Sequence, residues 1–127
     1  MSQHFDFDQV LEALKEPFPS AYVEWKPQSV SKDGKRALAA AYVDARRYQE
    51  RLDLVCPGWS SRIELLANGQ VAKVAITIAG VTREDVGEAS ADEANTVTTA
   101  VAQAFKRACA AFGLGRYLYF LPQQWCD

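Results

Sequence analysis

The sequence predicts an α+β fold, in which an antiparallel β-meander packs against one long amphipathic helix. Residues 71–79 alternate between apolar and polar side chains, as a half-buried strand does. The strand-like run 59–66 precedes them across Asn68-Gly69, a dipeptide typical of hairpin turns. A third strand-like run, residues 81–87, comes next, and a helical pattern follows it. The predicted core is therefore β-β-β-α.

Two helices and two strands are expected before this meander. Apolar residues at helical spacing predict a helix over residues 7–16, and two prolines then stop it. Residues 21–26 alternate like a strand that Pro27 ends, and residues 37–43 predict a second strand after a polar turn. Residues 44–55 predict a helix with an aspartate as its N-cap.

A long helix is the last expected element. Ser90 and Glu93 have the spacing of a capping box, in which each side chain accepts a hydrogen bond from the other residue's backbone N–H. Gly113 is expected to end the helix in the left-handed conformation. The helix should lie across one face of the sheet through a stripe made of Ala94, Val97, Val101, Phe105, Ala108 and Phe112.

Length and composition fit one globular domain over residues 1–127. Hydrophobic residues make up 49% of the chain and charged residues 24%, a balance typical of soluble domains. No apolar run approaches the roughly 18 residues that a membrane span needs. The N-terminal residues lack a basic start followed by an apolar stretch. We therefore expect no membrane partner and a cytoplasmic location.

Charge is unevenly distributed along the chain. The net charge is −2, which by itself argues against nucleic acid as a partner. Between Lys26 and Arg51, however, seven basic residues face three acidic ones, and this segment carries +4. Segregation of this kind can produce a basic face on an acidic protein, although a set of solvated side chains would give the same count.

The sequence offers no candidate for catalysis or for metal binding. Its one Gly-x-Gly, at Gly113 and Gly115, follows a helix instead of opening one, so no nucleotide cofactor is expected. His4 is the only histidine, and the three cysteines, at positions 56, 109 and 126, lack zinc-binding spacing. Glu84 and Asp85 are consecutive strand residues that point to opposite faces. We expect a protein that is not an enzyme.

Candidate binding residues lie at two places in the sequence. Lys106 and Arg107 lie on the polar side of the last helix, and two cations there can contact phosphate groups. Trp25 and Tyr42 border the basic segment and are the best candidates for base stacking, which contributes about 1–3 kcal/mol per base. Solvated cations and core aromatic rings are the competing interpretations.

Residues 83–113 resemble the signature of the Rad-fifty-two-type single-strand annealing proteins. The matching residues are Glu84-Asp85-Val86-Gly87, Lys106-Arg107-Ala108 and Phe112-Gly113. Upstream, the segments PFP, WKP, RAL, YVDAR, RLD and CPGW are similar to the bacterial DNA-damage-response branch of that family; they begin at positions 17, 25, 36, 42, 51 and 56. The resemblance covers nearly the whole chain.

This resemblance implies binding of single-stranded DNA without ATP, for strand annealing or 3′-end protection in double-strand break repair and recombination. It implies a closed ring of many subunits, a groove that holds the DNA backbone, and a nucleoid-associated protein. By resemblance Lys106 and Arg107 form the groove floor, Lys26 is a further basic position, and Arg36, Arg46 and Arg47 extend the basic lining. The chain departs from some relatives by having Ala110 in place of a third arginine.

Two other classes of protein remain open at this point. A double-stranded-RNA-binding module is also built from a meander and helices, but its last helix begins with basic residues. Here that helix is expected to begin beside Asp92 and Glu93, which are acidic. The second alternative is a structural oligomer or small-molecule binder that contacts no nucleic acid.

Overall fold

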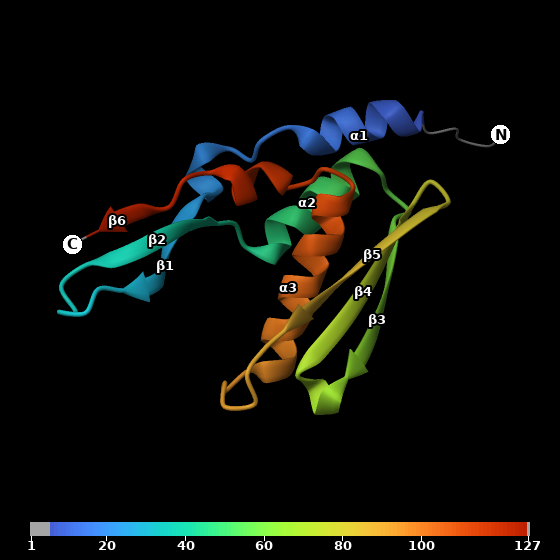
Figure 1. Cartoon of the computed structure of the whole chain (residues 1–127). Coiled ribbons are helices and arrows are strands. Elements are labelled where there is room, and N and C mark those ends of the chain that lie inside the picture. The colour runs from blue at the N-terminus through green and yellow to red at the C-terminus, as the bar shows by residue number, and fades with distance from the viewer. Residues whose placement is uncertain (1–5, 127) are drawn as a thin grey trace.

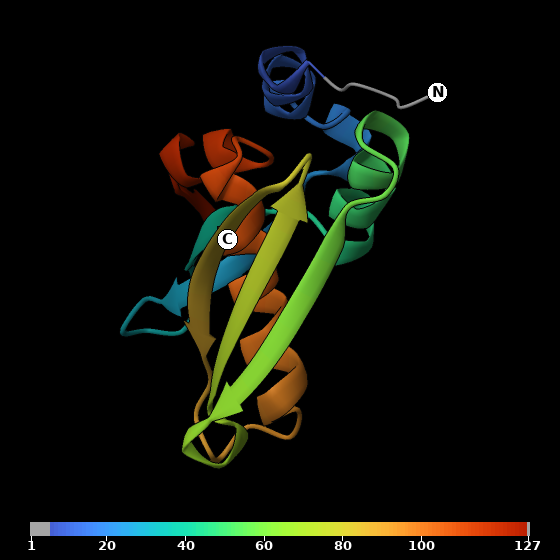
Figure 2. The same ribbon diagram turned by 90° about the vertical axis from the view of Figure 1, so that its right-hand side faces the viewer.

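The computed structural model describes residues 6–126 and has the predicted α+β architecture (Figure 1). The three strands of the meander are β3 (Ser60–Leu66), β4 (Val71–Ile78) and β5 (Val81–Glu88), and they pair antiparallel in the order β3-β4-β5. The long helix α3 (Thr96–Ala111) covers one face of this sheet, as Figure 2 shows. The predicted β-β-β-α core is therefore confirmed.

Alternation along β4 decides which face of the sheet meets the helix. Val74, Ile76 and Ile78 are buried, whereas Lys73 and Thr77 lie on the polar outer face. The hairpin before β4 is also confirmed. Its connection is a short 3-10 turn, in which both residues of the Asn-Gly dipeptide have positive φ.

A second sheet is built from segments at the two ends of the described chain. Strands β1 (Glu24–Val30) and β2 (Ala37–Tyr42) form a hairpin, and the three-residue strand β6 (Gln124–Cys126) adds to β2. The helix α1 (Phe7–Lys15) precedes this sheet, and α2 (Ala45–Val55) follows β2. Asp44 caps α2 as predicted, because its carboxylate accepts a hydrogen bond from the backbone N–H two residues later.

The prediction for the first strand was wrong at both ends. Residues 20–22 form a 3-10 turn, and β1 begins at Glu24 and continues through Pro27. Proline is tolerated here because β1 is an edge strand, and the register shifts between Pro27 and Ser29. Strand β6 and the preceding 3-10 helix η3 (Arg116–Phe120) were not predicted.

The start of α3 is a further correction. The helix begins at Thr96, and Ser90 and Glu93 form a turn whose two carbonyl oxygens accept hydrogen bonds from the Thr96 hydroxyl at 2.9 and 2.8 Å. The predicted capping box is therefore absent from this turn. Ala94 lies outside the helix, and Val97 is 43% exposed. The buried stripe consists of Ala100, Ala104, Phe105, Ala108, Cys109 and Phe112.

The core lies between α3, the meander and the two other helices. Small alanine side chains on α3 bring the helix close to β5, where Gly87 is buried. Trp59 is partly buried; its ring packs near Phe105, and its Nε1 donates to Asp53 at 2.7 Å. Cys56 is a buried free thiol, and burial raises its pKa to about 11.

A side-chain hydrogen bond joins η3 to the segment that follows α1. The backbone N–H of Phe18 donates to the Tyr117 hydroxyl at 3.0 Å. Tyr117→Phe should lower the free energy of unfolding by about 1 kcal/mol, because the Phe18 N–H then lacks its partner. Urea unfolding measures this loss, with Tyr22→Phe as a control tyrosine. Equal stability of Tyr117→Phe and the unmodified chain would show that the bond contributes nothing.

Candidate nucleic-acid interface

A groove of about 600 Å³ separates the β1–β2 hairpin from the polar side of α3. The hairpin extends to one side of α3, away from the meander, and the two elements enclose an angle in Figure 1. We call this hollow the hairpin–helix groove; its lining includes Gln28, Tyr42, Thr99, Gln103, Lys106 and Tyr119. It therefore joins parts of the sequence that are separated by more than fifty residues.

Two lysines meet at the ring of Tyr42, which lines this groove. The Nζ atoms of Lys26 and Lys106 each lie 3.6 Å from the ring centroid of Tyr42. Strand register explains the first contact, because Glu24 pairs with Tyr42 and Lys26, two residues further along, points to the same face. Lys106 approaches from α3. Three of the predicted binding residues are thus brought together.

The ammonium group of Lys106 is in an unfavourable place for a charge. Burial, with a smaller contribution from the positive charge of Lys26, lowers its pKa to about 8. Asp44 and Glu24 act in the opposite direction. The electron-rich face of Tyr42 also favours the cation, although such a contact stabilises it by only about 1–2 kcal/mol. An anion that enters the groove would therefore stabilise the charged form of Lys106.

Arg107 lies on the other side of α3, toward β5. Its guanidinium donates to the Val86 carbonyl at 2.9 Å, and one turn earlier the Gln103 side chain accepts from the Glu88 N–H at 2.7 Å. Arg107 also lies close enough to Tyr119 to oppose the rise in the tyrosine's pKa that burial causes. Arg107 thus holds the strand to the helix beside the groove.

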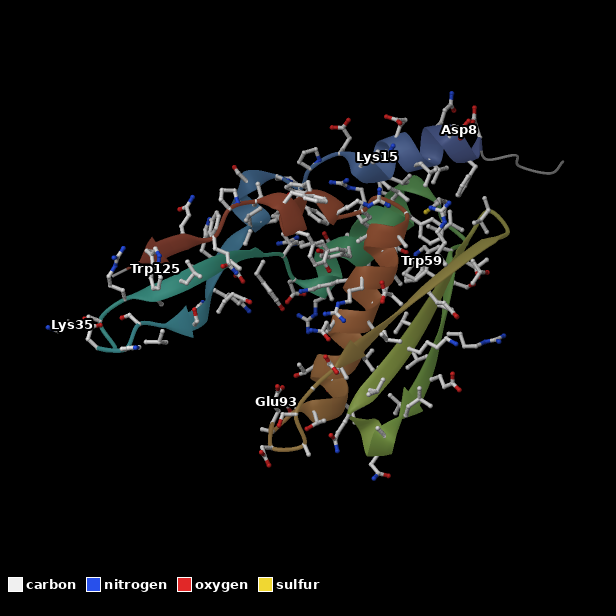
Figure 3. All side chains as sticks on the ribbon, in the orientation of Figure 1. Asp8, Lys15, Lys35, Trp59, Glu93 and Trp125 are labelled. Carbon is white, nitrogen blue, oxygen red and sulfur yellow. The ribbon has the colours of Figure 1, made fainter. Side chains whose placement is uncertain are left out.

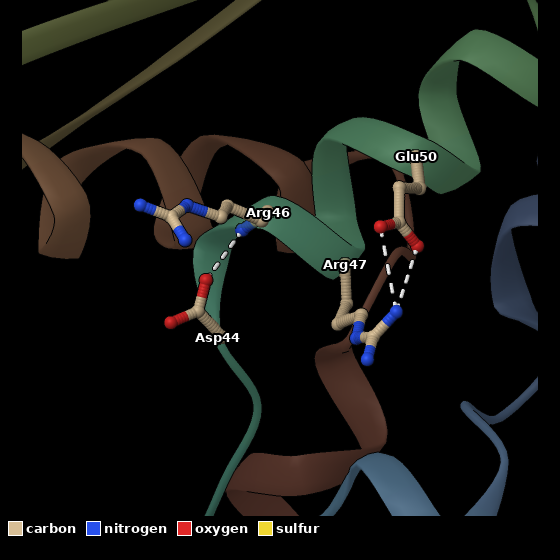
Figure 4. Close-up of polar contacts among 4 residues, drawn as sticks. All are labelled: Asp44, Arg46, Arg47 and Glu50. Carbon is tan, nitrogen blue, oxygen red and sulfur yellow. Dashed lines mark hydrogen bonds and ion pairs between the residues drawn. The ribbon is translucent and has the colours of Figure 1, made fainter.

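Arg46 and Arg47 are outside the hairpin–helix groove. Figure 4 marks a hydrogen bond from the Arg46 backbone N–H to Asp44, at 2.9 Å, and none from the Arg46 guanidinium to the other residues drawn. Arg47 forms an ion pair with Glu50 at 3.2 Å and lies 3.9 Å from the Tyr22 ring. Both arginines line a separate hollow of mixed charge with Glu24, Asp44 and Glu50.

Arg36 and Trp25 are also not gathered at the groove. Arg36 immediately precedes β2, beside the hairpin turn, and its guanidinium lies 5.2 Å from the Trp125 ring. The neighbouring Lys35 marks this end of the hairpin in Figure 3. Trp25 is 42% exposed and adjoins Lys26 in β1, so it points to the opposite face of the hairpin. Of the two predicted stacking residues, only Tyr42 lines the groove.

Tyr119 is the groove residue that sequence reasoning missed. It lies in η3, and 59% of it is exposed. Gly113 and Gly115 both have left-handed φ, and they turn the chain back from the end of α3 so that Tyr119 faces the groove. Two glycines so close together after a helix are the sequence signal for this reversal.

Neither metal chemistry nor a membrane span is indicated within residues 6–126. This part of the chain contains no cluster of three or more potential metal ligands. None of its helices combines the length and the apolar character needed to cross a bilayer. His4 lies outside the described residues.

The chain matches the Rad52/22 family of double-strand break repair proteins over residues 6–127, and it belongs to that family. It is 45% identical over 119 residues to the single-stranded DNA-binding protein DdrA of Deinococcus deserti, an alignment that covers 91% of this chain and 59% of the relative. It is 46% identical over 121 residues to DdrA of Deinococcus radiodurans, covering 93% and 58%. The chain thus spans less than two thirds of these curated relatives.

Proposed function

We propose that this chain binds single-stranded DNA and, without ATP, anneals strands or protects 3′ ends during double-strand break repair. The single observation that carries the proposal is the meeting of Lys26 and Lys106 at the Tyr42 ring, in a groove of a Rad52/22-family chain. The named function of the two DdrA relatives supports the same substrate.

The proposed mechanism is recognition of the DNA backbone. Lys106 and Lys26 neutralise phosphates and release their counterions, which gives affinity that is independent of base sequence. Tyr42 positions the two lysines, and Tyr119, which lines the same groove and is exposed, offers a ring face for the sugar or for one base. Arg107 contributes charge beside Tyr119, and Arg36, Arg46 and Arg47 lie further along the path of a longer strand. Backbone binding leaves the other base edges free to pair, which annealing requires.

A closed ring of copies completes the proposal. One subunit offers few cations, and repetition around a ring would multiply weak contacts into strong binding. Exposed apolar side chains on separate parts of the surface support self-association: Ile63 and Leu65 on β3, and Phe120 and Trp125 beyond α3. In this scheme residues 1–127 act as one domain for both DNA binding and assembly.

The salt dependence of binding tests backbone recognition. Fluorescence anisotropy with a labelled thymidine oligonucleotide should give affinity that falls linearly with salt on logarithmic axes, by roughly 0.7 per phosphate neutralised. Unlabelled duplex RNA should compete poorly. A flat salt response, or stronger competition by duplex RNA, would contradict the proposal. Electron microscopy of the same complex tests the ring.

A further inference from the structure

The side-chain nitrogen of Lys106 has surroundings that differ from those of an ordinary surface lysine. The residue is half-buried, and its Nζ lies 3.6 Å from the centre of the Tyr42 ring and 5.8 Å from that of Tyr48. Within residues 6–126 no carboxylate lies within ion-pair distance of it. By contrast, Lys73 forms an ion pair with Glu84 at 3.2 Å on the outer face of the meander.

We propose that the Nζ of Lys106 forms a Schiff base with the ring-opened aldehyde of an abasic deoxyribose in single-stranded DNA held in the hairpin–helix groove. The inference rests on the proposed function, because it needs DNA in that groove. It adds a chemical class of substrate: a strand that has lost one base. The result would be reversible covalent capture of the damaged strand.

The covalent step is balanced without an oxidant or a metal. The nitrogen lone pair attacks the C1′ carbonyl carbon, and a C–N bond forms as the carbonyl π bond becomes a hydroxyl group. Loss of that hydroxyl with a proton, as water, gives the imine. The amine contributes both hydrogens removed overall, so one aldehyde and one amine become one imine and one water. Hydrolysis reverses the step.

The groups around Lys106 favour the neutral amine that this step needs. Burial and the neighbouring Lys26 lower the pKa to about 8, against the opposing effects of Asp44 and Glu24. The neutral fraction at pH 7 is then on the order of a hundredfold larger than for an ordinary lysine. The rings of Tyr42 and Tyr48 favour the ammonium form of Lys106, but they carry no formal negative charge that would pair with it. Bound phosphates favour the ammonium form of Lys106. In the DNA complex, the pKa of Lys106 should therefore lie at or somewhat above 8.

Position along the DNA backbone supports the sugar as the target. A lysine that contacts a phosphate is adjacent to the deoxyribose on either side of it, since each phosphate joins two sugars. The groove, with about 600 Å³, has the size of an ordinary small-ligand site and can hold a sugar together with its phosphates. Loss of the base removes the bulkiest part of that nucleotide and exposes the aldehyde carbon.

Reductive trapping tests the inference. The purified chain is mixed with a single-stranded oligonucleotide that carries one abasic site, made by excising uracil, and cyanoborohydride is added to reduce the imine to a stable amine. Adduct is measured on a denaturing gel, and the attached residue is identified by mass spectrometry of peptides. Lys106→Arg removes the nucleophilic amine but keeps a cation; Lys73→Arg is the matched control outside the groove. All proteins are compared at equal DNA occupancy.

We expect adduct at Lys106, a loss of at least tenfold in Lys106→Arg, and an unchanged yield in Lys73→Arg. The rate of adduct formation should rise between pH 6.5 and 8.5. Binding of the abasic strand without adduct, or adduct that persists in Lys106→Arg or maps to another amine, overturns the inference and leaves the proposed function intact. Failure to bind an intact strand contradicts the proposed function itself and the inference with it.

Discussion

Gly87→Ala is expected to destabilise the chain by about 3 kcal/mol or more, because the added methyl group cannot fit between β5 and α3. A Cβ atom at this position would lie 2.4 Å from the Ala100 carbonyl oxygen and 2.5 Å from the Ala104 nitrogen. Both neighbours are helix backbone, so neither can turn aside as a flexible side chain would. The strand and helix would have to separate, and that movement would also disturb Lys106. Thermal or urea unfolding measures the loss.

Gly34→Ala provides the matched control for this substitution. Gly34 has a φ of +73° in the β1–β2 turn, and a Cβ there would meet nothing within 4 Å. Gly34→Ala should therefore lower the free energy of unfolding by about 1 kcal/mol, only because alanine disfavours this backbone conformation. If Gly87→Ala were no more destabilising than Gly34→Ala, the close approach of α3 to β5 would not be the reason for glycine at position 87.

Replacing Lys26 and Lys106 together by glutamine should weaken binding of single-stranded DNA on the order of a hundredfold at low salt, if each charge-assisted contact contributes about 1.5 kcal/mol. The logarithmic salt slope should become shallower by about 1.4, because two phosphate contacts are lost. Glutamine retains much of the side-chain length, so the measurement reports mainly charge. Anisotropy titrations at several salt concentrations give both quantities.

The control for this pair is Lys15→Gln with Lys73→Gln. It changes the net charge by the same amount, and both lysines are half-exposed and ion-paired outside the groove, to Glu12 and Glu84. The control should keep the affinity within about twofold at moderate salt, where distant charges are screened. Equal losses in the two double variants would mean that only overall charge matters and that the groove has no special role.

The parts of the fold that follow from local rules could be predicted from the sequence. Alternation along β4 and the Asn68-Gly69 turn depend on neighbouring residues, and the structure confirms both. The start of α3 was misplaced because the spacing of Ser90 and Glu93 suits a cap, yet their carbonyl groups are bonded by Thr96 in a turn. Strand β6 was missed because its pairing with β2 bridges about 85 residues.

The candidate site could be predicted only as a set of separate residues. Lys26, Tyr42 and Lys106 were each expected, but their meeting depends on how the hairpin lies against α3, which no local pattern encodes. Trp25 was a reasonable stacking candidate by composition, yet its position next to Lys26 puts it on the other face. Tyr119 reaches the groove because the chain reverses direction after α3. The 3-10 helix η3, which contains Tyr119, was not predicted.

The hydrogen bonds from α3 to β5 limit how copies of this sheet could join. Outward-facing backbone groups of β5 are occupied by the Arg107 and Gln103 side chains near its end, and the N–H of Val86 donates to Asp85. The last residues of β5 are therefore closed to another strand, whereas among residues 6–126 no strand covers the outer border of β3. Copies that paired strand to strand along the full length of a meander border would meet at β3, and the end of β5 would take no part in such a contact.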